Sequence, residues 1–152
     1  ATISSNAGTE SFLAREASTQ TVQDNVYTQV SFSTEVFDTG NNFASNTFTA
    51  PSSGKYYLFT NVTIAGTSSV AMSHFVSLFY KNNAALDYFR TVYQDEVLES
   101  IMIQQTLSAV IDLSANDTIK VYAKGNANNN TVRFIDKVFG GFRIAWVIYL
   151  IK

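Results

Sequence analysis

Hydrophobic and polar residues alternate along most of the chain with the period of two that is typical of β-strands. In 26–33, for example, Val26, Val30 and Phe32 fall on one side of an extended chain. Turn-forming residues separate such segments, most clearly at 51–54, which begins with proline and ends with glycine. The strands predicted in this way are 26–33, 43–50, 55–65, 73–80, 85–93, 100–113, 118–124, 131–135 and 139–151. Roughly eight to ten strands at this spacing indicate an all-β sandwich or barrel.

One segment also fits a helix. Within 96–107, Val97, Ile101 and Leu107 could share one helical face. The threonine, serine and β-branched residues of this segment favour a strand instead, because such side chains lose rotamer freedom in a helix. The prediction is therefore a strand, with the helix as the alternative.

Two of the predicted strands are hydrophobic on both faces, whereas a strand in a sandwich normally has one buried and one wet face. In 142–151 only Arg143 is polar, and in 55–65 Tyr57 and Phe59 lie opposite a second apolar face. Burial of three or four such side chains is worth about 5–10 kcal/mol. We therefore expect copies of the chain to associate through these strands; the alternative is that a loop or helix covers them.

The low content of charged residues is consistent with burial of part of the surface between copies of the chain, and the composition argues against several functions. The chain has 152 residues, and only 14% are charged, against about 25% in an average domain. This length predicts one domain over 11–152, after a flexible lead-in or linker over 1–10 that is rich in serine, threonine, asparagine and glycine. A net charge of −2 with ten lysines and arginines argues against nucleic acid. The absence of cysteine excludes disulfides, cysteine-type zinc sites and thiol nucleophiles. The longest apolar run, 142–151, is about half as long as a membrane-spanning helix, so no membrane insertion is expected.

Candidate catalytic chemistry is sparse. His74 is the one histidine, and no nucleophile elbow, phosphate loop or zinc motif accompanies it. The sequence therefore predicts that the protein is not an enzyme and holds no cofactor. Asp95, Glu96 and Glu99 are weak candidates for calcium, because Ca²⁺ takes carboxylate oxygens from loops. Their spacing follows no EF-hand pattern, which favours solvated loop charges.

Five residues are candidates for contacts with a protein or glycan partner: Tyr88, Arg90, Tyr93, Asn126 and Asn128. Tyrosine and arginine are enriched at the energetic centres of interfaces. The asparagines lie in the polar loop 125–130, and loops on a rigid scaffold often carry binding residues. The alternative for each of the five is ordinary strand or loop packing.

From about Glu10 to its end, the chain resembles the C1q domain. The spaced aromatic series that runs from Phe32 through Phe43 and Phe48 to the stretch 54–59 is similar to the C1q signature ending in Gly-x-Tyr-x-Phe. The sequence departs from that signature where the Phe43 to Phe48 gap is two residues shorter, and where leucine replaces a phenylalanine within 54–59.

Two further motifs carry the resemblance. The sequence Phe-Gly-Gly-Phe at 139–142 looks like the closing Phe-x-Gly-Phe motif of C1q domains. The stretch 113–121 is similar to their Leu-x-x-Gly-Asp-x-Val-x-Val turn, with Asn116 in place of glycine. In addition, 30–40 followed by 48–56 looks like the C1q-like modules of bacteriophage and bacterial surface proteins.

The resemblance implies an antiparallel jelly-roll sandwich of about ten strands, of the C1q/tumour-necrosis-factor (TNF) type, assembled as a trimer. Because some C1q-like domains bind Ca²⁺, it also raises the calcium hypothesis slightly. Combined with the doubly apolar strands, it predicts that the trimer interface includes Tyr57, Phe59, Val147, Tyr149 and Ile151.

We therefore expect a non-enzymatic, homotrimeric structural or adhesive module on the virion surface or in the extracellular space. It would act as a fibre head or decoration protein, with other virion or surface proteins and a protein or glycan receptor as partners. Two alternatives remain open at this point. One is a secreted C1q-like or lectin-like recognition domain, and the other is a capsid subunit whose core is completed only by other chains.

Overall fold

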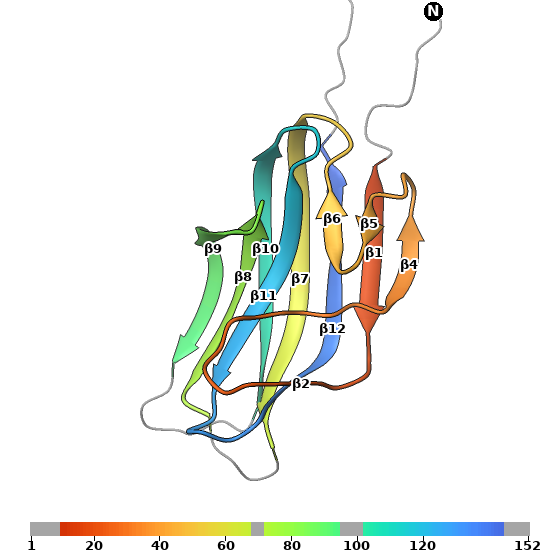
Figure 1. Ribbon diagram of the computed structural model, residues 1–152. Helices are drawn as coiled ribbons and strands as arrows, with labels where there is room; N and C mark the ends of the chain where they lie inside the picture. The colour runs from red at the N-terminus through yellow and green to blue at the C-terminus, as the bar shows by residue number, and fades with distance from the viewer. Residues whose placement is uncertain (1–9, 68–71, 95–101, 145–152) are drawn as a thin grey trace, which may run out of the picture.

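The computed structural model describes residues 10–67, 72–94 and 102–144, which form two antiparallel β-sheets packed face to face (Figure 1). The strands are β1 (Ser11–Glu16), β2 (Gln20–Val22), β3 (Thr28–Gln29), β4 (Thr34–Asp38), β5 (Phe43–Ala44), β6 (Thr47–Thr49), β7 (Gly54–Gly66), β8 (His74–Lys81), β9 (Ala84–Gln94), β10 (Met102–Leu113), β11 (Thr118–Asn126) and β12 (Val132–Arg143). The first sheet has the order β10-β7-β12-β1-β4, with β2 attached to β12. The second has the order β5-β6-β11-β8-β9, with β3 attached to β11. The predicted all-β sandwich is confirmed.

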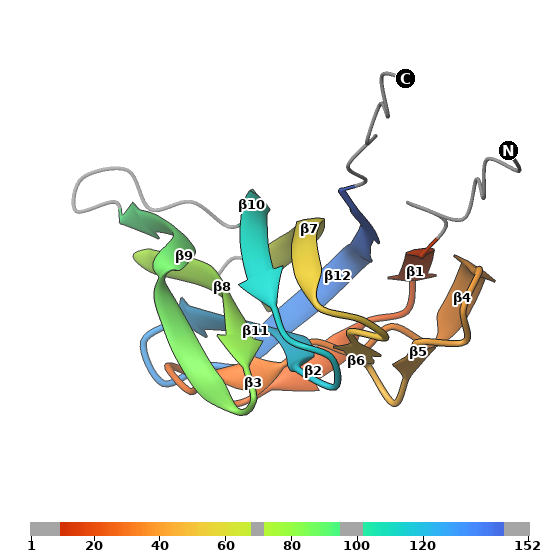
Figure 2. The same ribbon diagram turned by 90° about the horizontal axis from the view of Figure 1, so that it is seen from above.

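Phenylalanine rings tie the two sheets together, and the view from above shows the sheets as two facing rows (Figure 2). Phe12 of the first sheet stacks on Phe48 of the second with 4.6 Å between ring centroids, and on Phe43 with 5.3 Å. Phe139 meets Phe12 edge-on at 4.9 Å, and Phe32 lies 5.6 Å from Phe139. All five side chains are at most 6% exposed. Such ring pairs add about 0.5–1.5 kcal/mol each beyond the area they bury.

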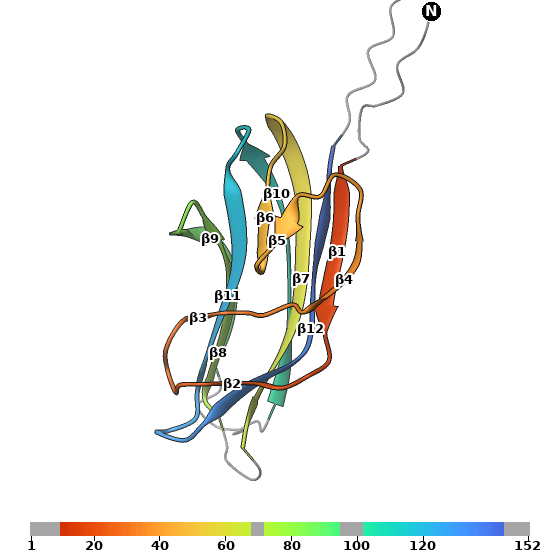
Figure 3. The same ribbon diagram turned by 45° about the vertical axis from the view of Figure 1, so that its right-hand side comes forward.

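The segment between β1 and β4 crosses from the first sheet to the second. β2 pairs with β12 and β3 pairs with β11, so the connection runs across the side of the sandwich (Figure 3). Gln20 secures the crossing, because its Nε2 donates to the carbonyl of Gln29 at 2.8 Å and its Oε1 accepts from the backbone N–H of Ser31 at 2.9 Å. The side-chain oxygen of Asn46 accepts from the N–H of Phe32 at 2.7 Å. Side chains thus satisfy backbone groups that no neighbouring strand reaches.

Several predicted strands are confirmed with nearly the expected bounds. The segments 55–65 and 118–124 form most of β7 and β11, and the hairpin predicted around residue 82 joins β8 to β9. Asn82 and Asn83 have φ angles of 50° and 66°. Two successive left-handed residues are what a type I′ turn requires, and asparagine adopts this conformation readily.

The prediction for 26–33 is wrong in extent, because only Thr28–Gln29 pairs as a strand. Val30 and Phe32 of this segment do point into the core, whereas Val26 is 44% exposed. Side chains rather than a neighbouring strand take up much of the backbone hydrogen bonding of the segment. The strands Ser11–Glu16 and Thr34–Asp38 were not predicted. Thr34–Asp38 lies at a sheet edge and is mostly exposed, so it lacks the alternation that would indicate a strand.

The predicted strands 131–135 and 139–151 are also wrong as separate elements. Over the described residues they form one strand, Val132–Arg143, which passes through a β-bulge between Ile135 and Val138. Asp136 lies in this bulge with a φ of 48°. The lead-in expected over 1–10 concerns residues that, apart from Glu10, lie outside the described part of the chain.

The glycines of the 139–142 motif allow close packing of the central strands. A Cβ atom on Gly141 would lie 2.6 Å from the backbone oxygen of Tyr57, and one on Gly140 would lie 2.9 Å from that of Phe12. Contacts under 3.0 Å are essentially never made by a real Cβ atom. The two positions therefore require glycine for β12 to lie between β7 and β1 at normal strand spacing.

The bulge in β12 accompanies a buried ion pair. Lys137 has a fully buried side chain, and its Nζ lies 3.3 Å from Oε2 of Glu16 and donates to the carbonyl of Ser18 at 2.9 Å. Burial by itself raises the pKa of Glu16. The hydrogen bonds from Ser18 and Ser31 and the charge of Lys137 together outweigh burial and lower this pKa to about 2. The pair thus holds the end of β1 to the bulge of β12.

We expect Lys137→Met to lower the free energy of unfolding by about 3–5 kcal/mol, because it leaves the Glu16 carboxylate without its cation in a mostly buried site. Urea denaturation measures this loss. The double variant Glu16→Gln with Lys137→Met should recover part of it, since no unpaired charge then remains. A Lys137→Met protein as stable as the wild type would contradict the structural role of the pair.

The pair also predicts acid sensitivity. The folded-state pKa of Glu16, about 2, lies below its ordinary value of 4.5. Its contribution to stability is therefore fully present above pH 4.5 and is lost as the pH falls toward 2. Thermal unfolding midpoints should fall more steeply over this range for the wild type than for Glu16→Gln. Parallel curves for the two proteins would show that Glu16 is not the group that titrates.

Candidate assembly interface

The outer face of the first sheet carries a group of hydrophobic side chains that point away from the core. We call this group the apolar face; its members are Leu13, Phe37, Tyr57, Phe59, Val110 and Phe142. Strand register places them in two neighbouring rows, since Val110 and Phe142 both pair with Tyr57, while Leu13 pairs with Phe37. Phe37, Val110 and Phe142 are 46%, 48% and 46% exposed.

Aromatic rings are the centre of the apolar face. The Tyr57 ring lies 5.4 Å from the Phe142 ring and 6.2 Å from the Phe59 ring, measured between centroids. Each ring therefore rests on a neighbour, and its outward side remains available to a partner. A continuous group of large apolar side chains on a surface marks a protein interface more often than chance exposure does.

Polar residues border the apolar face toward the opposite end of the sheet. Asn61, Gln104, Asp136 and Arg15 line a cavity of about 240 Å³ beside the buried Lys137. The side-chain oxygen of Asn61 is buried and has no hydrogen-bond partner among the described residues. Polar side chains thus predominate beyond the apolar face, although Met102 of β10 is also 54% exposed toward that end of the sheet.

Two of the residues predicted for the trimer interface, Tyr57 and Phe59, lie on the apolar face. The other three, Val147, Tyr149 and Ile151, lie outside the described residues. The predicted interface did not include the other four members of the apolar face, Leu13, Phe37, Val110 and Phe142. The register of β12 and β10 against β7 brings the last two beside Tyr57, and alternation within a single strand carries no information about register.

The structure separates the five residues predicted for partner binding. Tyr88 is 92% exposed and Arg90 is also exposed, both on the edge strand β9. Tyr93 lies on the other side of β9 and packs edge-on against buried Phe75 at 5.8 Å. Asn126 ends β11, and its Oδ1 accepts from the N–H of Asn128 in the following turn at 3.0 Å. These residues therefore do not form one site.

The outer face of the second sheet combines tyrosines with cations. The rings of Tyr80 and Tyr122 stack with 3.9 Å between centroids, and Nζ of Lys124 lies 4.7 Å from the ring centre of Tyr27. Partial burial lowers the pKa of His74, and the positive charges of Lys124 and Arg90 lower it further. A histidine that serves as a catalytic base normally has a carboxylate partner, whereas the charges that act on His74 are cations.

The carboxylate of Asp117 is engaged in a structural role. Its Oδ1 accepts from the Asn82 side chain at 2.7 Å, and its Oδ2 accepts from the N–H of Ser114 at 2.8 Å and lies 2.9 Å from Nζ of Lys81. These hydrogen bonds lower the pKa of Asp117 to about 2. The carboxylate thereby joins the β10–β11 turn to the β8–β9 turn.

The calcium candidates Asp95, Glu96 and Glu99 lie outside the described residues. Within 10–67, 72–94 and 102–144, no three histidine or acidic side chains gather closely enough to hold a metal ion. In the same ranges, no helix has the length and hydrophobicity needed to cross a membrane.

Comparison with known proteins gives a match in structure and none in sequence. No protein-family model and no curated protein matches the chain. The globular domain of zebrafish complement 1qA superposes with a TM-score of 0.59, at 18% identity over 92% of this chain and 98% of that one. Murine APRIL superposes with a TM-score of 0.64, at 14% identity over 89% and 98% of the two chains. The chain has a C1q/TNF-like jelly-roll fold.

This jelly roll confirms the fold that the aromatic signature implied. At 14–18% identity the likeness concerns the fold alone. The specific resemblance to modules of bacteriophage and bacterial surface proteins therefore stays a hypothesis.

The cluster around His74 gives a prediction for the second sheet. Lys124→Ala should raise the pKa of His74, and Arg90→Ala should raise it by less, because each removes a nearby positive charge. Titration of the imidazole C–H signals by NMR measures the shift. Lys120→Ala, a cation elsewhere on β11, is the control and should leave the pKa unchanged. If the pKa of His74 shifted equally in all three variants, the effect would come from the overall charge of the protein and not from the proximity of Lys124 and Arg90.

Proposed function

We propose that the protein is a non-enzymatic, homotrimeric recognition or structural module displayed on a virion or cell surface. The single observation that carries this proposal is the apolar face. Its three most exposed members, Phe37, Val110 and Phe142, are each close to half exposed on one side of one sheet. Burying them together with the outer sides of Tyr57 and Phe59 would contribute on the order of 5 kcal/mol per subunit.

Two further observations support the proposal. The C1q resemblance in the sequence implies three subunits about an axis, and the jelly-roll fold is compatible with that assembly. In addition, Glu10 and Arg143 are hydrogen-bonded neighbours at one end of the sandwich, with 3.0 Å between the Arg143 nitrogen and the Glu10 oxygen. Both described ends of the jelly roll therefore leave from the same end (Figure 1), as suits a module joined there to a stalk or particle.

Trimerisation would serve recognition through multivalency. Three identical surfaces on one particle convert later binding events into intramolecular ones, which raises the overall affinity without new contacts in each site. This mechanism needs no reactive group. It agrees with the structural roles found for the Glu16, Lys137 and Asp117 charges.

The mass in solution tests the proposal. By light scattering at about 10 μM, the wild type should have three times the subunit mass, and Phe142→Asp should shift it to the monomer, because a carboxylate cannot be buried unpaired in an apolar interface. Tyr88→Asp is the matched control, since it places the same charge on an exposed aromatic of the second sheet. It should remain trimeric.

Circular dichroism of both variants should match the wild type, which separates loss of assembly from loss of folding. A folded wild-type monomer at this concentration would overturn the trimer. It would favour a capsid subunit that is completed by a different chain. Equal dissociation of Phe142→Asp and Tyr88→Asp would show that the interface is not on the first sheet.

A further inference from the structure

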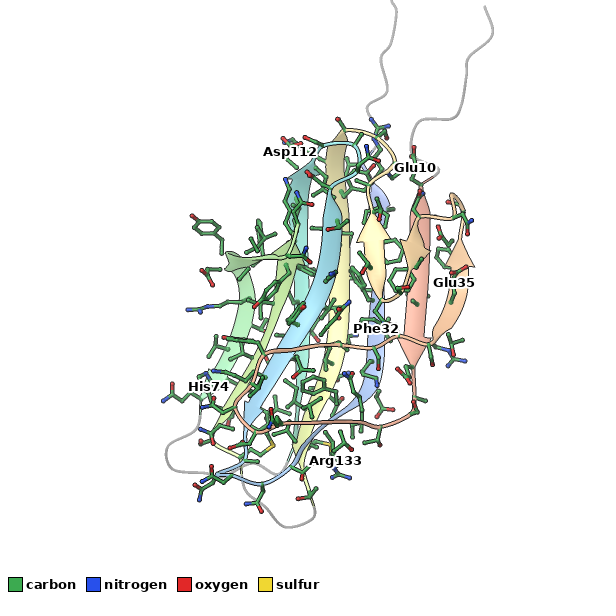
Figure 4. All side chains as sticks on the ribbon, in the orientation of Figure 1. Glu10, Phe32, Glu35, His74, Asp112 and Arg133 are labelled. Atoms are coloured by element: carbon green, nitrogen blue, oxygen red, sulfur yellow. The ribbon has the colours of Figure 1, made fainter. Side chains whose placement is uncertain are left out.

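A cavity of about 910 Å³ lies between the β2–β3 connection and the turn after β11. It is at the end of the sandwich marked by Arg133, opposite the end marked by Glu10 (Figure 4). Most of its lining is amide and hydroxyl side chains, among them Thr21, Asn25, Asn129, Asn130 and Thr131, and the carboxylate of Asp24 lies beside them. The cavity is open to solvent on one side, so a ligand would lie across it and remain partly exposed.

Hydrogen bonds hold the two walls of this cavity together. The carboxylate of Asp24 accepts from the backbone N–H of Ala127 and, at 2.8 Å, from that of Asn129. The N–H of Asn25 donates to the carbonyl of Gly125 at 2.8 Å. The Asn130 side chain donates to the Ala127 carbonyl at 3.0 Å, within its own turn. The walls are therefore formed before any ligand binds, which lowers the entropic cost of binding.

The lining selects for a neutral ligand rich in hydroxyl groups. Among the described residues that line the cavity, Asp24 is the one ionisable group, so an anion would meet a like charge and no cation. Val22 and Val26 are the apolar residues of this lining, too few to favour an apolar ligand. Amides and hydroxyls both donate and accept hydrogen bonds, and sugar hydroxyls do the same.

We propose that this cavity binds a short neutral oligosaccharide. Thr21 on β2 and Thr131 just before β12 supply hydroxyls from neighbouring strands, and Asn129 supplies an amide from the turn after β11. The Nδ2 of Asn130 donates to the carbonyls of Ala127 and Asn128, so Asn130 offers the ligand its side-chain oxygen as an acceptor. The site lies at the end of the sandwich opposite the one where the described chain begins and ends (Figure 1). A module displayed from that other end would present the site to its partner.

The proposal deepens the recognition role proposed above, but the cavity belongs to one subunit, so it can fail independently of the trimer. A trimer that binds no sugar would refute the cavity alone, and a monomer that binds sugar would refute the assembly alone.

The test is an NMR titration of the ¹⁵N-labelled full chain with maltotetraose, cellotetraose, N,N′,N″-triacetylchitotriose and lactose, with 3′-sialyllactose as the anionic counterpart of lactose. We expect at least one neutral sugar to saturate below about 10 mM. Its shifts should be concentrated in 21–26 and 129–131. The proposal would be overturned if no neutral sugar saturates or if the shifts map to other residues. Binding of 3′-sialyllactose alone, with none of the neutral sugars, would also overturn it.

Isosteric variants identify the site. Thr21→Val and Thr131→Val each remove one hydroxyl at constant shape from an exposed position, and each should weaken binding roughly fivefold. Thr34→Val makes the same change at an exposed position on β4, outside the cavity, and should leave the affinity unchanged. Equal affinities for the wild type and both cavity variants would show that the sugar binds without these hydroxyls and would overturn the assignment.

Discussion

Burial of the second hydrophobic face of β7 is the constraint on which the proposed assembly and the proposed role depend. β7 pairs along most of its length with β10 on one side and β12 on the other, so its backbone is satisfied within the sheet. Its inward side chains, such as Tyr56 and Leu58, are fully buried in the sandwich. Its outward rings Tyr57 and Phe59 extend an apolar surface across three strands. A second protein surface packed on that face would remove it from water.

Charged groups are few, and the structure uses several of them for architecture. Lys137 and Glu16 join β12 to β1 inside the sandwich, and Asp117 joins two turns at the other sheet. The outer face of the second sheet gathers Lys124 and Arg90 near His74. The two sheets therefore present different surfaces, one apolar and one rich in tyrosine and cations.

The core could be predicted from the sequence wherever hydrophobic and polar residues alternate along a strand, because this alternation shows which side chains are buried. The strands around Leu58 and Val121 and the Asn82 turn follow from residue types within a few positions, and the structure confirms them. The crossing segment 17–33 could not be predicted, because its backbone partners are side chains such as Gln20 and Asn46 that are distant in sequence. The same holds for the Lys137 site, which depends on a bulge with no local signature.

By itself, the sequence determined the fold class and the two apolar faces of the strand 55–65, since both follow from the order of side chains along an extended chain. It also determined that charge and cysteine are too scarce for several kinds of chemistry. Only the tertiary structure decided which apolar residues meet, because strand register sets Phe142 and Val110 beside Tyr57. It likewise decided that Asp24 and Asn129, 105 positions apart, are joined by a hydrogen bond that connects the two sides of a cavity. The physical reason is that side-chain alternation is a local property, whereas register and loop closure depend on contacts between distant segments.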